Sequence, residues 1–233
     1  MTRGAKAVMM LPEWEGENMI DCLLFDFDGT LFDTVEGITK SVQYAVNKLG
    51  LNPGLESLRC FAGPPLVDMF MEHFGFDRDT AVQATADFRE RYKPIGLYEC
   101  RVFPGIPEML ARLKDAGYLL GVATSKPQVL AEELLEREGM LSLFDALVGS
   151  SPDRNNDSKA DVLRRAMEAF GVSASQTVLI GDTKYDVLGA KQCGVPCIGV
   201  GWGYAAEGEL EAAGADWIVP DIPALEALLE KNK

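Results

Sequence analysis

Two aspartates, Asp26 and Asp28, stand one residue apart at the end of an apolar run. The run begins at Ile20 and contains β-branched and aromatic residues, which is typical of a buried strand. Carboxylates that leave a buried strand are costly unless a partner of opposite charge lies beside them. The pattern therefore predicts a cation, most simply a metal ion, at the end of this strand. Gly29 follows directly and is expected to turn the backbone.

Further polar residues follow other apolar runs. Thr124 and Ser125 end one of these runs, and Asp182 ends another, with Asp186 four residues later. In an open α/β sheet, ligands bind beyond the carboxyl ends of the strands. We therefore expect these side chains to meet the first two aspartates in one crevice.

Lys159 is a further candidate for this crevice. It follows Ser158, which is expected to cap the N-terminus of a helix. A lysine in the first turn faces the positive end of the helix dipole, which is mildly unfavourable. The position suggests a functional partner, but a solvated surface lysine is an equally open interpretation.

The residue types in the crevice favour Mg²⁺ and a phosphate-bearing substrate. A few carboxylate oxygens, completed by water and phosphate oxygens, suit this ion. The four aspartates contribute a formal charge of −4, while Mg²⁺ and Lys159 contribute +3, so a phosphate dianion would still be repelled. Protonation of Asp28 would ease this deficit and is also what a general acid requires. Backbone amides after Asp28 and around Ser125 are expected to bind phosphate oxygens.

The hydrophobic pattern predicts an α/β fold in which a Rossmann-like parallel sheet carries an inserted all-helical domain. Residues 1–18 form an N-terminal extension without a visible function. Residues 19–35 and 103–233 alternate strands with helices, which implies a parallel sheet covered on both faces. Residues 36–102 show helical periodicity and no comparable strand signal.

Individual elements follow from the same pattern. After the first strand, the expected strands are 118–123, 146–148, 177–180, 196–200 and 217–219. The expected helices are 38–49, 64–73, 79–92, 106–113, 129–137, 162–170, 187–192 and 222–229.

Composition excludes several classes of protein. The net charge of −14 argues against nucleic acid polymers and anionic membranes as partners, because both need a basic surface. No apolar run approaches the roughly 20 residues that span a bilayer. Five cysteines without a CxxC pair, together with a single histidine, indicate small core residues in a reducing, cytoplasmic protein and not a disulfide framework or zinc site.

Four motifs in this sequence resemble, in order, those of the haloacid dehalogenase superfamily. The first, residues 26–31 (Asp-Phe-Asp-Gly-Thr-Leu), is highly specific. The other three are weak singly but strong in their order and spacing. They consist of Thr124, Lys159 and the stretch Gly181-Asp182-Thr183 with Asp186. The resemblance extends from about residue 19 to the end of the chain.

The resemblance implies a role for each of these residues. Asp26 would be the nucleophile that forms an aspartyl-phosphate, and Asp28 would protonate the leaving group and then activate water. The expected phosphate-binding residues are Gly29, Thr124, Ser125 and Lys159. The expected Mg²⁺ site consists of Asp26, Asp28 (through its backbone carbonyl), Asp182 and Asp186.

The helical insert resembles the α-helical cap of this superfamily, which closes over the site and contacts the leaving group. Gly63, Pro64 and Pro65 resemble the substrate loop of the phosphoglycolate phosphatase-like branch, and residues 124–127 and 202–204 also fit that branch, which includes 5′-nucleotidases. The resemblance therefore implies a Mg²⁺-dependent phosphatase acting on a small phosphorylated metabolite similar to phosphoglycolate.

Alternatives to this function stay open. They are a 5′-nucleotidase acting on nucleoside monophosphates, a β-phosphoglucomutase-like phosphoryl transferase and, less favoured, a non-enzymatic phospho-accepting binding module. Asp28 argues against dehalogenase activity, because true dehalogenases of the superfamily lack the second aspartate. Tyr92 and Tyr204 are expected to be packing residues, and Arg91 is expected to lie on a solvated face. The sequence leaves monomer and homodimer undecided.

Overall fold

The structure is a computed structural model that describes residues 20–150 and 158–231. The expected N-terminal extension, residues 1–18, lies outside the described residues, as does most of the stretch before Lys159. Within the described ranges, no helix is long and apolar enough to cross a membrane.

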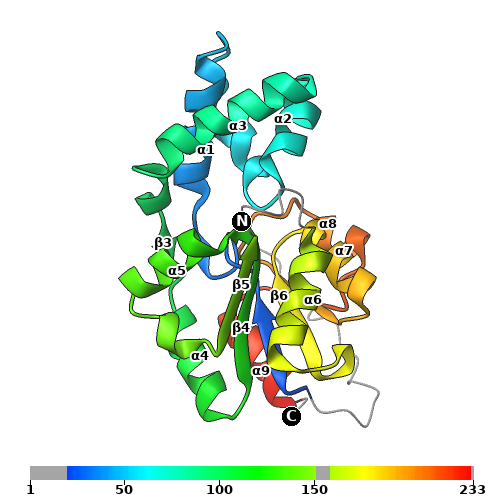
Figure 1. The fold of residues 1–233 in the computed structure, drawn as a ribbon. Coiled ribbons are helices and arrows are strands. Elements are labelled where there is room, and N and C mark those ends of the chain that lie inside the picture. Colours follow the sequence, from blue (N-terminus) through cyan, green and yellow to red (C-terminus); the bar gives the residue numbers. More distant parts are fainter. Residues whose placement is uncertain (1–19, 151–157, 232–233) are drawn as a thin grey trace, which may run out of the picture.

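A parallel sheet of six strands forms the centre of the molecule (Figure 1). β1 lies between β4 and β6, so the strands that precede the predicted site residues are direct neighbours. In spatial order the strands are β5 (Ala146–Ser150), β4 (Leu119–Pro127), β1 (Cys22–Phe25), β6 (Thr177–Gly181), β7 (Cys197–Val200) and β8 (Trp217–Val219).

Alternate residues of β1 belong to different cores, one on each face of the sheet. Leu23 and Phe25 pack with α4 (Ile106–Asp115), α5 (Gln128–Arg137) and α9 (Ile222–Lys231). Cys22 and Leu24 pack on the other face with α6 (Lys159–Phe170), α7 (Lys184–Cys193) and α8 (Glu209–Ala213). Because β1 is covered on both faces, its sequence is a continuous apolar run without polar alternation.

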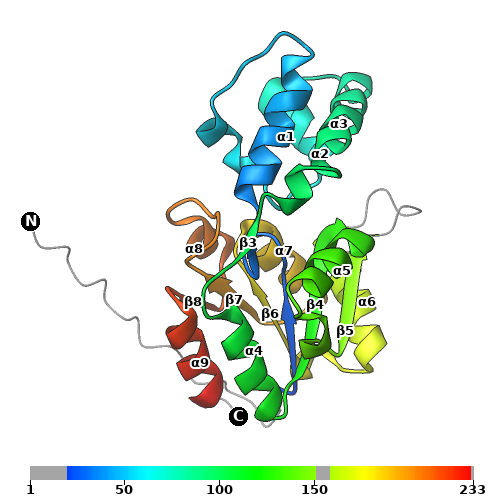
Figure 2. The same cartoon turned by 90° about the vertical axis from the view of Figure 1, so that its left-hand side faces the viewer.

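The helical insert between β1 and β4 lies beyond one end of the sheet, as both views show (Figures 1 and 2). A two-stranded antiparallel ribbon, β2 with β3, joins its two connections to the core. The elements of this region are β2 (Phe32–Asp33), α1 (Val35–Asn47), η1 (Leu55–Phe61), α2 (Leu66–Phe74), α3 (Arg78–Tyr92), η2 (Gly96–Tyr98) and β3 (Arg101–Val102).

The expected α/β fold with a parallel sheet and a helical insert is confirmed, whereas several element boundaries were wrong. α6 begins at Lys159, as the expected Ser158 cap implies, although its apolar periodicity begins only at Val162, and Ser158 and Asp161 form a capping box. The first turn of α7 is likewise fixed by polar capping and not by apolar periodicity. β4 continues to Pro127, and α8, β2 and β3 were not expected.

Candidate active site

The turn after β1 places Asp26 and Asp28 at the end of the sheet. The Asp26 amide donates to the Ile180 carbonyl at 2.8 Å, which extends the pairing of β1 with β6. The chain then turns at Gly29, whose φ is 85°. The Gly29 amide donates to the Phe32 carbonyl at 2.8 Å and so takes part in the turn, and its expected contact with phosphate stays a prediction.

Gly29 is needed for a second reason, which is its closeness to Asp182. A Cβ atom at Gly29 would lie 2.1 Å from Asp182 Oδ2, and one at Gly203 would lie 2.2 Å from Asp182 Cβ. The Asp182 side chain is therefore enclosed between two glycine backbones from distant parts of the chain.

Lys159 is a buried residue of this site and not a solvated surface lysine. Its Nζ lies 2.6 Å from Asp26 Oδ1 and 2.7 Å from Asp186 Oδ1. Burial alone would lower the pKa of Lys159, but the charges of Asp186 and Asp26 outweigh it and hold the pKa above its usual value. Lys159 therefore stays charged and neutralises part of the acidic cluster.

Asp26, Asp182 and Asp186 form a buried cluster suited to a cation. One carboxylate oxygen from each lies within 4.8 Å of the others. Among the described residues Asp182 has no ion-pair partner, and it accepts hydrogen bonds from the Thr30 hydroxyl at 3.0 Å and the Tyr204 amide at 2.8 Å. Burial, with the nearby charges of Asp186 and Asp26, raises its pKa well above the ordinary range. A divalent cation would relieve this repulsion, so the donor set fits a metal site.

Asp186 also stabilises the start of α7, in addition to belonging to the acidic cluster. Its Oδ2 accepts hydrogen bonds from the Thr183 amide at 3.0 Å and the Thr183 hydroxyl at 2.9 Å, which fixes the first turn of α7. Its other oxygen faces Lys159. The orientation of Asp186 is therefore set by the start of α7.

Asp28 is held by a different lysine, which the sequence did not reveal as a site residue. Lys126 Nζ donates to both Asp28 oxygens, at 2.9 and 3.2 Å, and to the Tyr92 hydroxyl at 2.7 Å. The ammonium also faces the rings of Phe27 and Tyr92. Burial lowers the pKa of Lys126, but the contacts with Asp28 and Tyr92 raise it by more. The pKa therefore lies above its usual value.

Lys126 corrects the charge count made from the sequence. The four aspartates give −4, Lys126 and Lys159 give +2, and a divalent cation would give a further +2, so the sum is zero. A protonated Asp28 is therefore not needed to balance the resting site. Tyr92 also differs from expectation, because its hydroxyl bonds Lys126 and connects the insert to the site.

Thr124 and Ser125 lie where β4 loses its regular pairing. The register of β4 with β5 shifts between Ala123 and Pro127. The buried Thr124 hydroxyl accepts a hydrogen bond from the Lys126 amide at 3.2 Å, and Ser125 is half-buried. Both residues are at the expected end of the strand, and their binding of phosphate stays a prediction.

The expected substrate loop of the insert reaches the core beside the acidic cluster. Gly63 has a φ of 107°, and a Cβ there would lie 3.8 Å from Thr183 Cγ2. A cleft of about 450 Å³ lies between insert and core. Its lining includes Arg59, Pro64 and His73 from the insert, and Thr183, Tyr185 and Tyr204 from the core.

Comparison with known proteins gives the family. The model of the haloacid dehalogenase-like hydrolases matches residues 23–200. The chain belongs to this family. The relationship expected from the four motifs is thereby confirmed.

Similar proteins include a nucleotidase and phosphatases. A 5′-nucleotidase of Pseudomonas aeruginosa is 44% identical over 211 residues, which are 90% of this chain and 96% of that protein. A phosphoglycolate phosphatase of Cupriavidus necator is 35% identical and covers 89% of this chain and 92% of its own length. A crystal structure of a predicted phosphatase from Clostridium acetobutylicum, 44% identical, superposes with a TM-score of 0.88 over 91% of this chain and 100% of its own.

Binding of a divalent cation should weaken in acid. Burial raises the pKa of Asp26 to about 6 in the metal-free protein, although Lys159 opposes this shift. The metal takes the ionised carboxylate, so Mg²⁺ affinity measured by calorimetry should be about tenfold lower at pH 5 than at pH 7. Equal affinities at the two pH values would contradict a metal bound through Asp26.

The stability of the metal-free protein should fall as pH rises, whereas its affinity for Mg²⁺ should increase. Because the native Asp26 holds a proton that the unfolded chain loses near its ordinary value of 3.8, the free energy of unfolding falls as pH rises through the window up to about 6. Added Mg²⁺ should therefore raise the melting temperature more at pH 7 than at pH 5.

Asp182→Asn should stabilise the metal-free protein and abolish its stabilisation by Mg²⁺. The amide removes a buried charge without a cationic partner among the described residues, yet it can still accept from Tyr204 and bond Thr30. We expect a gain of about 1–3 kcal/mol in the free energy of unfolding, measured in urea with EDTA. The exposed control Asp115→Asn should change neither quantity. A destabilised Asp182→Asn protein would contradict the unfavourable burial and charge repulsion that we assign to this carboxylate.

Proposed function

We propose that this protein is a Mg²⁺-dependent phosphatase that hydrolyses phosphomonoesters through a phosphorylated Asp26. The observation that carries the proposal is the separation of two neighbouring carboxylates into different environments. Asp26 lies with Lys159 and the acidic cluster, whereas Asp28 lies with Lys126 and a tyrosine of the insert. Two carboxyl groups with different partners suit two different chemical roles.

Asp26 would be the nucleophile. Lys159, at 2.6 Å, favours its ionised form and would hold a phosphoryl oxygen beside it. A divalent ion held by Asp26, Asp182 and the Asp28 carbonyl, and oriented by Asp186, would offset negative charge on the transferring group. Thr124 and Ser125 would bind the remaining phosphoryl oxygens from the end of β4.

Asp28 would carry the proton transfers. As the general acid, Asp28 would hold a proton when the substrate is bound. In the first step Asp26 attacks phosphorus, the bond from phosphorus to the leaving oxygen breaks, and that oxygen takes the Asp28 proton. In the second step Asp28 accepts a proton from water, the water oxygen attacks phosphorus, and the bond from phosphorus to Asp26 breaks. Inorganic phosphate then leaves and the ionised Asp26 is restored.

The insert would act as a cap. Tyr92 and the loop at Gly63 both reach groups at the end of the sheet. A cap in this position would exclude water during the first step and contact the leaving group.

Nucleoside 5′-monophosphates are the proposed substrates. The similarity to the 44% identical 5′-nucleotidase supports this alternative better than the phosphoglycolate-like substrate that we favoured from the sequence. The cleft gives a second argument, because a volume of about 450 Å³ with two tyrosines suits an aromatic base. The Arg59 guanidinium lies 5.9 Å from the centre of the Tyr204 ring, so a planar cation also faces this space.

Replacement of the two acids should separate their roles. Asp26→Asn should lose at least about 10³-fold in kcat and form no phosphoenzyme. Asp28→Asn should slow alkyl phosphates by about 10²–10⁴-fold and p-nitrophenyl phosphate less, because a good leaving group needs less protonation. Steady-state rates, with Asp115→Asn as control, measure both effects. Full activity of Asp26→Asn would contradict the mechanism, and equal losses on both esters would remove Asp28 from the acid role.

A substrate panel tests the leaving-group assignment. We expect kcat/KM to be at least about tenfold higher for nucleoside 5′-monophosphates than for phosphoglycolate, sugar phosphates or pyrophosphate. Arg59→Met should raise KM for a nucleotide about tenfold and leave KM for p-nitrophenyl phosphate unchanged. The exposed Arg78→Met is the matched control. Preference for phosphoglycolate would restore the first expectation, and phosphate retained on a sugar would indicate a mutase.

A further inference from the structure

The start of α1 is capped by a residue far away in the sequence. The Tyr204 hydroxyl accepts hydrogen bonds from the Thr34 amide at 2.6 Å and the Val35 amide at 3.1 Å, and it donates to Asp33 Oδ1 at 3.1 Å. A third amide of this turn, that of Gly37, donates to the Glu99 carbonyl at 3.2 Å. The first turn of the insert is thus held by groups from outside its own helix.

Thr34 occupies the position of the helix cap but does not act as one. Its hydroxyl is buried and has no hydrogen-bond partner within residues 20–150 and 158–231. Its ψ is 3°, whereas ψ is 167° at Asp77 and 164° at Ser158, the residues whose side chains cap α3 and α6. Threonine is among the preferred N-cap residues, and its unpaired buried hydroxyl is costly. The chain therefore carries two candidate caps for α1, of which one is in use.

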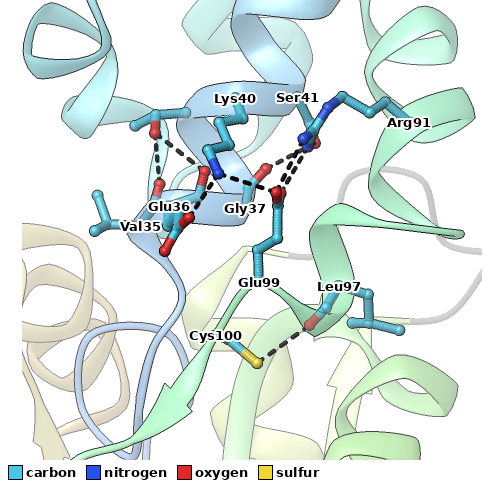
Figure 3. A network of polar contacts seen from close by, with 10 residues as sticks. Val35, Glu36, Gly37, Lys40, Ser41, Arg91, Leu97, Glu99 and Cys100 are labelled. Carbon is cyan, nitrogen blue, oxygen red and sulfur yellow. Dashed lines mark hydrogen bonds and ion pairs between the residues drawn. The ribbon is translucent and has the colours of Figure 1, made fainter.

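A change of ψ at Thr34 would move the insert as a unit. Thr34 is the one residue between β2 and α1. On the insert side, Glu99 binds Lys40 at 3.0 Å and Arg91 at 2.8 Å, and Arg91 also reaches Ser41, so α1, α3 and the returning chain are tied together (Figure 3). These bonds also correct the expectation that Arg91 lies on a solvated face.

Thr34 would act as a hinge between the core and the insert. Close backbone packing makes the insert side of this hinge rigid. A Cβ at Gly37 would lie 1.9 Å from the Gly96 carbonyl oxygen, so α1 and η2 touch without intervening side chains. On the core side, Arg101 binds Asp33 at 2.9 Å across the β2–β3 ribbon. Cys100, between Glu99 and Arg101, is therefore the second point at which the insert can pivot.

Tyr204 is joined to the metal cluster by its own backbone. Its amide donates to Asp182 Oδ2 at 2.8 Å, while its hydroxyl holds the hinge. Trp202, two residues earlier, donates to the Thr30 carbonyl at 3.1 Å and secures the same loop to the turn after β1. One residue thus fixes both an acid of the site and the angle of the insert.

We propose that Tyr204 is the positioning residue that sets the insert over the acidic cluster, and that the insert opens when the Thr34 hydroxyl replaces the Tyr204 hydroxyl as the cap of α1. In the open state Thr34 adopts an extended ψ and accepts from the amide of Glu36 or Gly37. The exchange of caps stands on the hinge geometry alone, whereas its effect on turnover rests on the proposed phosphatase function.

The two hydroxyls should show coupled effects on stability although they are not bonded to each other. Thr34→Val in the native background removes an unpaired hydroxyl, so the melting temperature should stay equal or rise. In the Tyr204→Phe background the same change removes the replacement cap, so the melting temperature should fall by roughly 2–4 °C. If Thr34→Val changes the melting temperature equally in both backgrounds, the proposed exchange of caps is wrong.

The position of the insert has an independent readout in Cys100, which is half-buried at the second pivot and donates to the Leu97 carbonyl. Labelling by a disulfide reagent, with the rate of Cys100→Ser subtracted, should be severalfold faster in Tyr204→Phe and slower in Thr34→Val. An unchanged rate in Tyr204→Phe would overturn the claim that the hydroxyl holds the insert.

Kinetics then test the link to turnover. Tyr204→Phe keeps the ring and the amide bond to Asp182, so Mg²⁺ affinity should be unchanged, while KM for a nucleoside monophosphate should rise severalfold because fewer molecules are closed. Equal KM values would overturn the positioning role. If no variant hydrolyses any phosphomonoester, the proposed function fails, while melting and labelling still decide the exchange of caps.

Discussion

Repulsion among buried carboxylates is the constraint on which the rest of this structure depends. Asp26, Asp182 and Asp186 lie within reach of one cation, and Asp28 is two residues from the first of them. Folding brings these charges out of water, so each needs a compensating group close by. Two buried lysines supply part of this compensation: Lys159 contacts Asp26, and Lys126 contacts Asp28. The remaining charge is what fits the site to a divalent ion.

Compensation also ties the two parts of the molecule together. Lys126 bonds Asp28 and a tyrosine of the insert, and Tyr204 bonds Asp182 and the start of the insert. The groups that organise the acids are therefore the groups that locate the helical region above them. Tyr92 reaches the lysine of Asp28 through its side chain, whereas Tyr204 holds the insert with its hydroxyl and Asp182 with its backbone amide.

Much of this architecture follows from the sequence, and the exceptions share a cause. The parallel sheet and the meeting of Asp26, Asp28 and Asp182 follow from the apolar runs and from the rule that parallel strands end at one edge. Lys126 could not be assigned, because nothing near it shows that it points inward toward Asp28, 98 residues earlier. Tyr204 was expected to pack for the same reason, since its hydroxyl partners lie about 170 residues away. Helix starts were missed where capping and not periodicity defines them, as at Lys184. The cleft that we propose to select the substrate is lined by both parts of the chain, and no local sequence pattern describes such a surface.

The order of strands in the sheet has a consequence for biosynthesis. β1 is made first, yet it lies between β4 and β6, and its pairing with β6 joins Cys22 to Thr177. On a ribosome the Asp-x-Asp turn emerges long before Asp182 and Tyr204, so the nascent chain carries it in water, where its charges cost nothing. The acidic cluster can form only after Asp182 and Asp186 have left the exit tunnel. A cation that needs all three carboxylates therefore finds no complete site on the earlier nascent chain.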